Sequence, residues 1–200
     1  MRVVVGLGNP GGEYATTRHN LGFRVVQELA RRWRLTFEPF GSSARVAHGV
    51  IAGEHTMLVE PQLYMNRSGA ALAEVAPLIV PSDLVVIHDD LDLAFGSVRV
   101  KRGGGTAGHR GLDSIASHFG YDFTRVRVGI GRPAQGEEDV AGYVLSAYPA
   151  EQRDAVAAAV ERAADAVECV LRDGEEKAMN CFNVRAKSGV AAAPAPMGRK

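Results

Sequence analysis

The order of apolar patterns along this chain limits its fold more than any other feature. Short runs, most of them rich in Val and Ile, are typical of strands, and longer segments with apolar residues every three or four positions are typical of helices. The strand-like runs are residues 2–7, 45–52, 55–61, 84–89, 98–101 and 125–130. The helix-like segments are residues 20–33, 66–76, 112–119 and 151–172. Because the two kinds interleave, the sequence predicts an α/β fold with a mixed, largely parallel β-sheet flanked by helices.

Length and composition narrow the class further. With 200 residues, 46% of them hydrophobic, the chain has the size and apolar content of a single domain with a core. It has no apolar run of about 18 residues, as a membrane span requires, and residues 1–12 lack the apolar region of a signal peptide. Two cysteines are too few for a disulfide framework, so we expect a cytoplasmic protein. We predict one domain over residues 1–185 and a flexible, disordered tail over the Ala- and Pro-rich residues 186–200.

Charge is unevenly distributed along the chain, although the formal net charge is zero. Residues 95–135 carry seven basic and two acidic side chains, whereas residues 136–176 carry three basic and eleven acidic ones. Six of those seven cations are Arg, whose planar guanidinium suits phosphate. The basic segment therefore either binds a phosphate-rich partner such as nucleic acid or forms a solvated surface balanced by the acidic segment.

The sequence GLGNPG, residues 6–11, follows the first predicted strand and matches the G-x-G-x-x-G pattern of dinucleotide-binding loops. Two details count against that interpretation. Pro10 stands where a phosphate-binding helix would offer backbone N–H groups, and no acidic residue ends a second strand about 20 residues later. The glycines suit a tight turn instead, or a loop that directs the amide of Asn9 into a cleft.

The sequence HDDLD, residues 88–92, ends a predicted strand, where open α/β sheets hold their ligand sites. Its side chains could bind a divalent metal. Alternatively, one of its carboxylates orients a distant histidine, as in a catalytic triad. His19, just before the first predicted helix, is a candidate: it either acts as a general base or is an exposed or helix-capping residue.

The remaining motifs leave alternatives open as well. In MNRSG, Asn66 could cap a helix or stabilise an oxyanion, and the preceding Tyr64 could stack on a base or pack in the core. His109, in a glycine-rich loop, is either a ligand contact or a helix N-terminal residue. There is no GxSxG nucleophile elbow, and both cysteines suit packing, so the sequence favours attack by a base-activated water over a covalent nucleophile.

Taken together, five motifs resemble those of the bacterial peptidyl-tRNA hydrolase family. They occur in the family's order, and their spacing covers almost all of residues 1–185. The motifs are GLGNPGGEY and TRHNLGF within residues 6–23, PQLYMNRSG at 61–69, HDDLDLAFG at 88–96, GGGTAGHRGL at 103–112 and RVRVGIGRP at 125–133. The resemblance implies a monomeric α/β domain with a twisted mixed sheet. It also implies hydrolysis of the ester that joins a peptide to the terminal ribose of tRNA.

The resemblance assigns roles to single residues. It implies that His19 is the catalytic base and that Asp92 is the carboxylate that keeps His19 in its basic form. Asn9 and Asn66 match the asparagines that hold the acyl end of the substrate and support the oxyanion, and Asn9 also discriminates blocked from free aminoacyl-tRNA. The residues that match tRNA contacts are Tyr14, Tyr64, Lys101, Arg127 and Arg110.

The implied partner is peptidyl-tRNA, through its acceptor stem and 3′ end, with no metal, cofactor, membrane or obligate protein partner. Arg110 departs from the family, which commonly has Asn at this position. Since Arg has no acceptor, its contact either moves to tRNA phosphate or is relayed by water. The alternative function is a non-catalytic RNA-binding relative of the same fold, like the plant organellar splicing factors that resemble this family.

Overall fold

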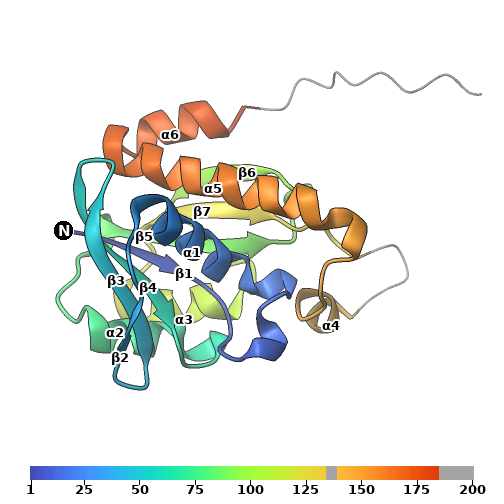
Figure 1. The fold of residues 1–200 in the computed structure, drawn as a ribbon, viewed down its shortest axis with the longest axis horizontal. Coiled ribbons are helices and arrows are strands. Elements are labelled where there is room, and N and C mark those ends of the chain that lie inside the picture. The colour runs from blue at the N-terminus through green and yellow to red at the C-terminus, as the bar shows by residue number, and fades with distance from the viewer. Residues whose placement is uncertain (134–138, 185–200) are drawn as a thin grey trace, which may run out of the picture.

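The computed structural model describes residues 1–133 and 139–184. Seven strands form one sheet in the order β2–β3–β4–β1–β5–β7–β6 (Figure 1). The strands are β1 (Arg2–Gly6), β2 (Glu38–Phe40), β3 (Ala44–Ile51), β4 (Glu54–Pro61), β5 (Leu84–Asp90), β6 (Val98–Arg102) and β7 (Thr124–Gly129). The helices are α1 (Leu21–Trp33), α2 (Ser68–Val75), α3 (Arg110–Phe119), α4 (Val140–Val144), α5 (Arg153–Asp173) and α6 (Glu175–Phe182). Three short 3-10 turns matter for the site: η1 (Gly12–Tyr14), η2 (Arg18–Asn20) and η3 (Met65–Arg67).

The centre of the sheet is parallel and its edges are antiparallel. Strands β4, β1, β5 and β7 run parallel to one another. Strands β2, β3 and β6 add antiparallel pairings at the two sides. The predicted α/β domain with a mixed, largely parallel sheet is therefore confirmed.

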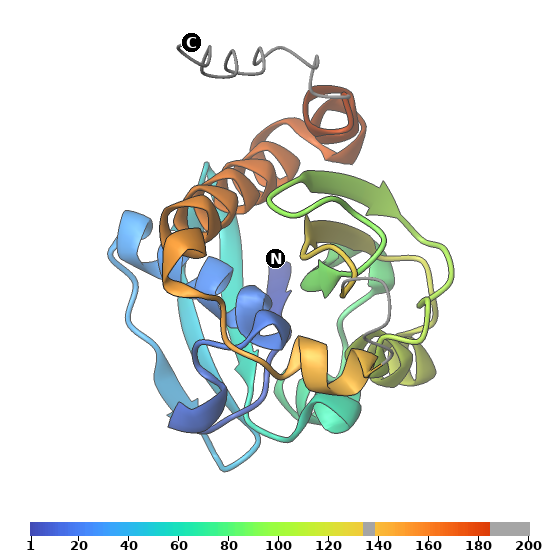
Figure 2. The same ribbon diagram turned by 90° about the vertical axis from the view of Figure 1, so that its right-hand side faces the viewer.

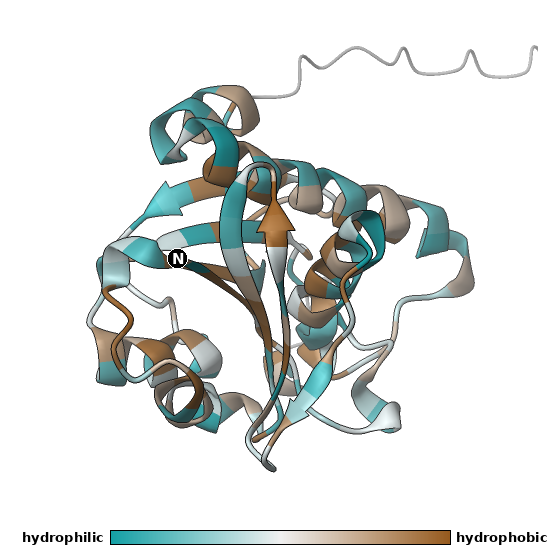
Figure 3. Cartoon of the chain, turned by 60° about the vertical axis from the view of Figure 1, so that its left-hand side comes forward, coloured by the Kyte–Doolittle hydropathy of each residue, from teal (hydrophilic) through white to brown (hydrophobic). Residues whose placement is uncertain are grey.

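Helices cover both faces of the sheet. Helices α1 and α5 lie on one face and α2 and α3 on the other, and α6 packs against α5 and β6 (Figure 1). Successive residues of β1 alternate between these layers: Val4 packs in the core beneath α1 and α5, whereas Val3 and Val5 pack with α2 and α3. The strands in the middle of the sheet are largely brown in Figure 3, as expected for strands buried on both faces.

The junction between β1 and α1 is a close backbone contact. A Cβ on Gly6 would lie 2.2 Å from the carbonyl oxygen of Gly22, and one on Gly22 would lie 2.3 Å from the backbone nitrogen of Leu7. A Cβ on Gly8 would lie 2.7 Å from the Phe23 ring. The glycines of GLGNPG thus allow α1 to approach the sheet, which supports the turn interpretation of this motif over the nucleotide-binding one.

Three elements are missing from the sequence prediction because their signals are short. Strand β2 has the exposed sequence Glu-Pro-Phe and is defined by its edge pairing with β3. Helices α4 and α6 have five and eight residues, too few for a clear helical period. No helix within residues 1–133 and 139–184 is long and apolar enough to cross a membrane. The predicted tail at residues 186–200 lies outside the described residues.

Candidate active site

A pocket of about 490 Å³ opens at the carboxyl ends of the central strands. The loop after β1, the end of β5, η2 and η3 bring polar side chains to it, and α4 and the glycine-rich segment before α3 form its other walls. In Figure 2, α4 lies beside the blue N-terminal segment that contains η2. Since open α/β sheets bind ligands at this edge, the strand topology decides where the site lies.

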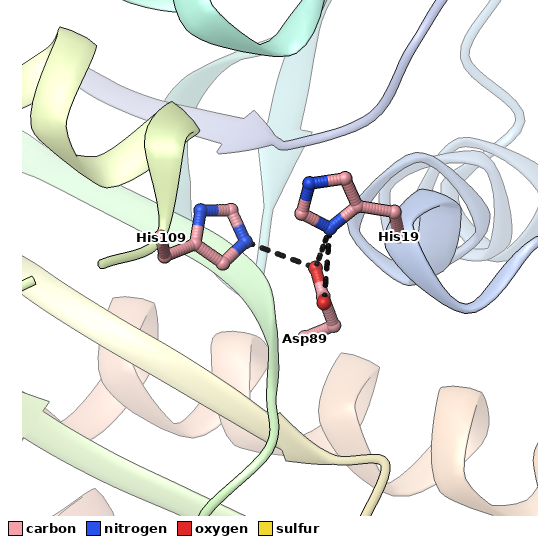
Figure 4. A group of neighbouring side chains, drawn as sticks. All are labelled: His19, Asp89 and His109. Carbon is pink, nitrogen blue, oxygen red and sulfur yellow. Dashed lines mark hydrogen bonds and ion pairs between the residues drawn. The ribbon is translucent and has the colours of Figure 1, made fainter. Parts of the chain in front are cut away.

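His19 lies in η2, directly before α1, and its side chain is 12% exposed. Its Nδ1 is 2.9 Å from Oδ1 and 3.0 Å from Oδ2 of Asp89 (Figure 4). A carboxylate only accepts hydrogen bonds, so the neutral ring carries its proton on Nδ1 and a lone pair on Nε2. Nε2 has no hydrogen-bond partner among the described residues, and the ring lines the pocket. This nitrogen is therefore available to a molecule in the pocket.

Asp89, near the end of β5, is a buried carboxylate with a side chain that is 2% exposed. Burial alone would raise the pKa of this carboxyl, but the imidazoles of His109 and His19 hold that pKa well below its usual range. Burial, with His109 close by, also lowers the pKa of the neighbouring His88 to about 3. At neutral pH the pocket therefore has an ionised Asp89 beside a neutral His88.

The sequence prediction that Asp92 is the carboxylate partner of His19 is wrong, because Asp89 occupies that place. Asp92 lies two residues beyond the end of β5, with a side chain that is 49% exposed, and accepts a hydrogen bond from Arg132 at 3.1 Å. Asp89 is still within the strand, where its pairing with β7 fixes the backbone. Three carboxylates within four residues look alike in the sequence, but Asp89 and Asp90 belong to β5 and point to opposite faces of the sheet, whereas Asp92 lies beyond the strand.

The polar side chains of HDDLD do not converge on one point. His88 Nδ1 donates to the backbone carbonyl of Asp89 at 2.7 Å, and Asp90 accepts from Arg127 at 2.8 Å. Asp92 and the Asp89 carboxylate have the separate partners described above. The structure therefore gives no support to the interpretation of this motif as a divalent-metal site.

His109 is the second histidine that contacts the Asp89 carboxylate. Its Nε2 is 2.9 Å from Asp89 Oδ1, and its Nδ1 accepts hydrogen bonds from the N–H groups of Gly111 and Leu112. Among the described residues, His19, Asp89 and His109 form the one group of potential metal ligands, with atoms within 4.8 Å of one another. A metal bound to His109 Nε2 would leave that ring without a proton on either nitrogen, so hydrogen bonding accounts better for this cluster.

Asn9 lies on the loop after β1 and is 7% exposed. Its Oδ1 accepts a hydrogen bond from the N–H of Met65 at 2.8 Å, which leaves the two donors of its amide nitrogen for the pocket. Asn20 fixes this loop: its side chain accepts from the N–H of Asn9 and donates to the carbonyl of Asn9, each at 2.9 Å. Asn9 and His19 thus line the same pocket.

Asn66, in η3, and Tyr64 are exposed residues of the pocket lining. The helix-cap interpretation of Asn66 is wrong, because the N-cap position of α2 is Arg67 and no side chain caps it. The side chain of Asn66 makes no hydrogen bond among the described residues and faces the pocket freely. Tyr14, in η1, packs edge-on against Tyr64 with ring centroids 6.4 Å apart. The two tyrosines predicted to contact tRNA therefore lie together.

Strands β6 and β7 carry four cations at directly opposite positions, which we name the β6–β7 basic cluster. The opposite pairs are Lys101 with Arg125 and Arg99 with Arg127. Arg127 is ion-paired with Asp90 at 2.8 Å, and Arg125 is buried and donates to the carbonyl of Gly105. Lys101 is exposed and has no ion pair among the described residues. Of the two predicted phosphate contacts on these strands, Lys101 is the uncompensated charge and Arg127 is the neutralised one.

Arg110 is the exposed first residue of α3 and lines the pocket. It makes no ion pair or side-chain hydrogen bond among the described residues. With Arg67 it also lines a shallower groove between α2 and α3. Arg110 thus places a cation where the pocket meets this groove.

Arg18 has a structural role that the sequence analysis missed. It is 8% exposed and donates to Ser146 Oγ at 2.6 Å and to the carbonyl of Ala147 at 3.0 Å. Its guanidinium also lies 4.4 Å from the ring centroid of Tyr143 and 4.9 Å from that of Tyr148. Arg18 therefore ties the segment before α1 to the α4 segment that forms a pocket wall. No local pattern could reveal this contact, which spans 128 residues.

The fold and the pocket define an α/β protein with a His–Asp pair open to substrate, the class that includes general-base hydrolases. A family model described as peptidyl-tRNA hydrolase matches residues 3–190. The chain belongs to the peptidyl-tRNA hydrolase family.

Individual relatives agree with this assignment. A peptidyl-tRNA hydrolase from Rubrobacter xylanophilus is 50% identical over 186 residues, which cover 91% of this chain and 100% of that protein. One from Syntrophotalea carbinolica is 46% identical over 188 residues, with 92% and 98% covered. The crystal structure of peptidyl-tRNA hydrolase from Acinetobacter baumannii matches with a TM-score of 0.84 at 38% identity, and the match covers 92% of this chain and 94% of that one.

Proposed function

We propose that this protein hydrolyses the ester between peptide and tRNA with His19 as general base. The observation that supports the proposal most directly is the His19–Asp89 contact at 2.9 Å, with Nε2 of His19 left available in the pocket. Nε2 takes a proton from a water molecule, whose oxygen attacks the ester carbonyl carbon. Asp89 accepts the Nδ1 proton throughout, which fixes the tautomer and stabilises the imidazolium.

The two asparagines stabilise the substrate and the tetrahedral intermediate. The free amide donors of Asn9 bind a carbonyl oxygen of the peptide, and the unpartnered amide of Asn66 donates to the developing oxyanion. When the intermediate collapses, the carbon–oxygen bond to the ribose breaks, and the imidazolium of His19 returns its proton to the leaving ribose oxygen. The products are a peptide with a free carboxylate and a tRNA with a free 3′ end.

The tRNA binds through the cations and tyrosines around the pocket. Lys101 and Arg110 are exposed charges without ion-pair partners among the described residues, and they suit phosphates of the acceptor stem and 3′ end. Tyr64 and Tyr14 offer ring surfaces next to the pocket for the terminal bases. In this proposal the protein acts as a monomer, and it needs no metal or cofactor.

Hydrolysis of N-blocked and free aminoacyl-tRNA by wild type and His19→Ala, in excess EDTA, tests the proposal. Wild type should cleave the blocked substrate only. The variant should lose roughly 10²- to 10⁴-fold in kcat, the usual range for a general base, while its tRNA affinity stays unchanged. If both proteins bind tRNA and neither cleaves it, the protein is an RNA-binding relative. If only added magnesium restores cleavage, a metal-dependent mechanism replaces this one.

A further inference from the structure

The helix that follows His109 determines which of its ring nitrogens carries the proton. Nδ1 of this N-cap residue lies 3.2 Å from the backbone nitrogen of Gly111 and 3.4 Å from that of Leu112. Backbone N–H groups only donate, so Nδ1 must offer its lone pair. The ring proton is therefore on Nε2, from which it is donated to Oδ1 of Asp89 at 2.9 Å.

Asp89 is consequently held by two imidazoles. Its Oδ1 accepts from both His109 and His19 at 2.9 Å, and its Oδ2 lies 3.0 Å from His19 (Figure 4). The His109 ring is itself confined, because its centroid lies 4.8 Å from that of His19 and 5.2 Å from that of His88. These contacts hold the buried carboxylate in the orientation that accepts a hydrogen bond from Nδ1 of His19.

We infer that His109 is a positioning residue for the His19–Asp89 pair: the N-terminus of α3 fixes its tautomer, and its Nε2–H fixes the carboxylate. The expected effect of His109 on catalysis rests on the proposed function, whereas the assignment of its ring proton to Nε2 does not. By sharing the negative charge on Oδ1, the His109 N–H also weakens the attraction between Asp89 and a protonated His19.

The other groups around the pair cannot replace this contact. They include the charged or titratable groups of Arg18, His88, Asp90 and Tyr148. His88 donates to the backbone carbonyl of Asp89 and leaves the carboxylate free, and Asp90 is ion-paired with an arginine of β7. The Tyr148 hydroxyl is buried without a hydrogen-bond partner among the described residues, and Arg18 is engaged with the segment after α4. None of these four side chains makes a hydrogen bond to the Asp89 carboxylate, which His19 and His109 contact.

Two substitutions distinguish the role of His109 as N-cap of α3 from its contact with Asp89. His109→Asn keeps an acceptor close to the place of Nδ1 and is a good N-cap, but its side chain is too short to bring a donor to Asp89. His109→Gln keeps a donor at longer reach and gives up the cap. The measurements are kcat and kcat/KM for N-blocked aminoacyl-tRNA, together with the melting temperature of each variant.

The inference predicts that His109→Asn is the more damaging change for activity. Its kcat should fall roughly 10- to 100-fold, as expected for a lost hydrogen bond to a charged group. Its melting temperature should stay near that of wild type. His109→Gln should retain most of kcat while it melts at a lower temperature. The reverse ranking would show that His109 is only a helix cap.

Long-range proton–nitrogen spectra of the histidine rings test the tautomer without any reliance on activity. The His109 signals, identified by their loss in His109→Asn, should show a protonated Nε2 and an unprotonated Nδ1. A proton on Nδ1 overturns the inference even if the protein cleaves peptidyl-tRNA. The expected tautomer in a protein that cleaves nothing would support the inference and remove the proposed function.

Discussion

Among single residues, Asp89 shows how backbone position separates chemically identical side chains. It accepts hydrogen bonds from two histidines, whereas Asp90 and Asp92 are ion-paired with arginines. Asp89 and Asp90 point to opposite faces of β5, and Asp92 lies beyond its end. The oxygen that faces His19 therefore belongs to the most buried of them.

The difference between Asp89 and Asp92 can be tested with a matched pair of substitutions. Asp89→Asn should lower kcat by about 10⁴-fold, because its amide can hold His19 in the wrong tautomer, as in serine proteases. Asp92→Asn removes an exposed ion pair worth about 0–1 kcal/mol and should keep near-wild-type hydrolysis. Greater damage from Asp92→Asn than from Asp89→Asn would restore the prediction made from the sequence.

His88 makes the stability of the protein depend on pH. Its pKa falls from 6.5 to about 3 on folding, so between these values the unfolded chain binds more protons than the folded one. The free energy of unfolding should therefore decrease as the pH falls from 6.5 to 5, by up to about 1.4 kcal/mol per unit from this group. Asp89 contributes later, because its stabilisation is lost only as the pH approaches and passes below the usual Asp value of 3.8.

Urea denaturation of wild type and His88→Asn at several pH values between 6.5 and 5 measures this contribution. Asn can still donate to the carbonyl of Asp89 but does not titrate. The free energy of unfolding of the variant should change less steeply with pH than that of wild type. If the free energy of unfolding changed equally with pH in wild type and in His88→Asn, His88 would have to take up a proton in the folded protein.

Among elements, the sequence predicts those with long or regular patterns and misses those held by distant partners. Helix α5, with 21 residues, and the central strands have periodic apolar patterns, whereas α4 has five residues and is held by Arg18 from the other end of the chain. The same limit applies to the site. His19 and Asn9 stand out in their motifs, but the contact of His19 with Asp89 joins residues 70 positions apart. Such a contact depends on strand order, which periodicity does not encode.

At the β1–α1 junction, we expect a Gly→Ala substitution to destabilise the protein, although this change usually stabilises a helix. Gly→Ala within a helix usually stabilises a protein by about 0.5–1 kcal/mol. In Gly22→Ala the new Cβ would lie 2.3 Å from the backbone nitrogen of Leu7 and 2.6 Å from the carbonyl oxygen of Ile87, neither of which can rotate away. We expect a loss of stability and, because α1 carries η2 with it, a loss of hydrolysis.

Thermal melting and kcat of Gly22→Ala check this prediction. Gly12→Ala is a suitable control, because a Cβ there meets no atom within 4 Å. The control should melt near the wild-type temperature. A Gly22→Ala protein more stable than wild type would show that the junction can open without cost.

For the whole molecule, we expect tRNA binding to depend on the distribution of charge more than on the net charge. The protein is formally neutral, yet the β6–β7 basic cluster concentrates four cations on two paired strands. Phosphate contacts release counterions, so tRNA affinity should fall steeply with salt in spite of the neutral total.

Lys101→Gln tests this salt dependence at the exposed cation of the β6–β7 basic cluster, which has no ion pair among the described residues. The slope of log affinity for tRNA against log salt should become less steep by about 1, the share of one phosphate contact. Lys177→Gln, on the exposed surface of α6, removes the same charge elsewhere and should leave the slope unchanged. Equal slopes for wild type and Lys101→Gln would place the tRNA away from the cluster.

The order in which the sheet is assembled has a consequence for the protein's own synthesis. A chain still attached to the ribosome is itself a peptidyl-tRNA, the kind of molecule that this family cleaves. The pocket takes residues from Asn9 to Leu145, and the face of the sheet beneath it is covered by α5, which ends at Asp173. No nascent chain much shorter than this can bury its core and complete the pocket. The pocket can therefore form on this core only after α5 has been synthesised.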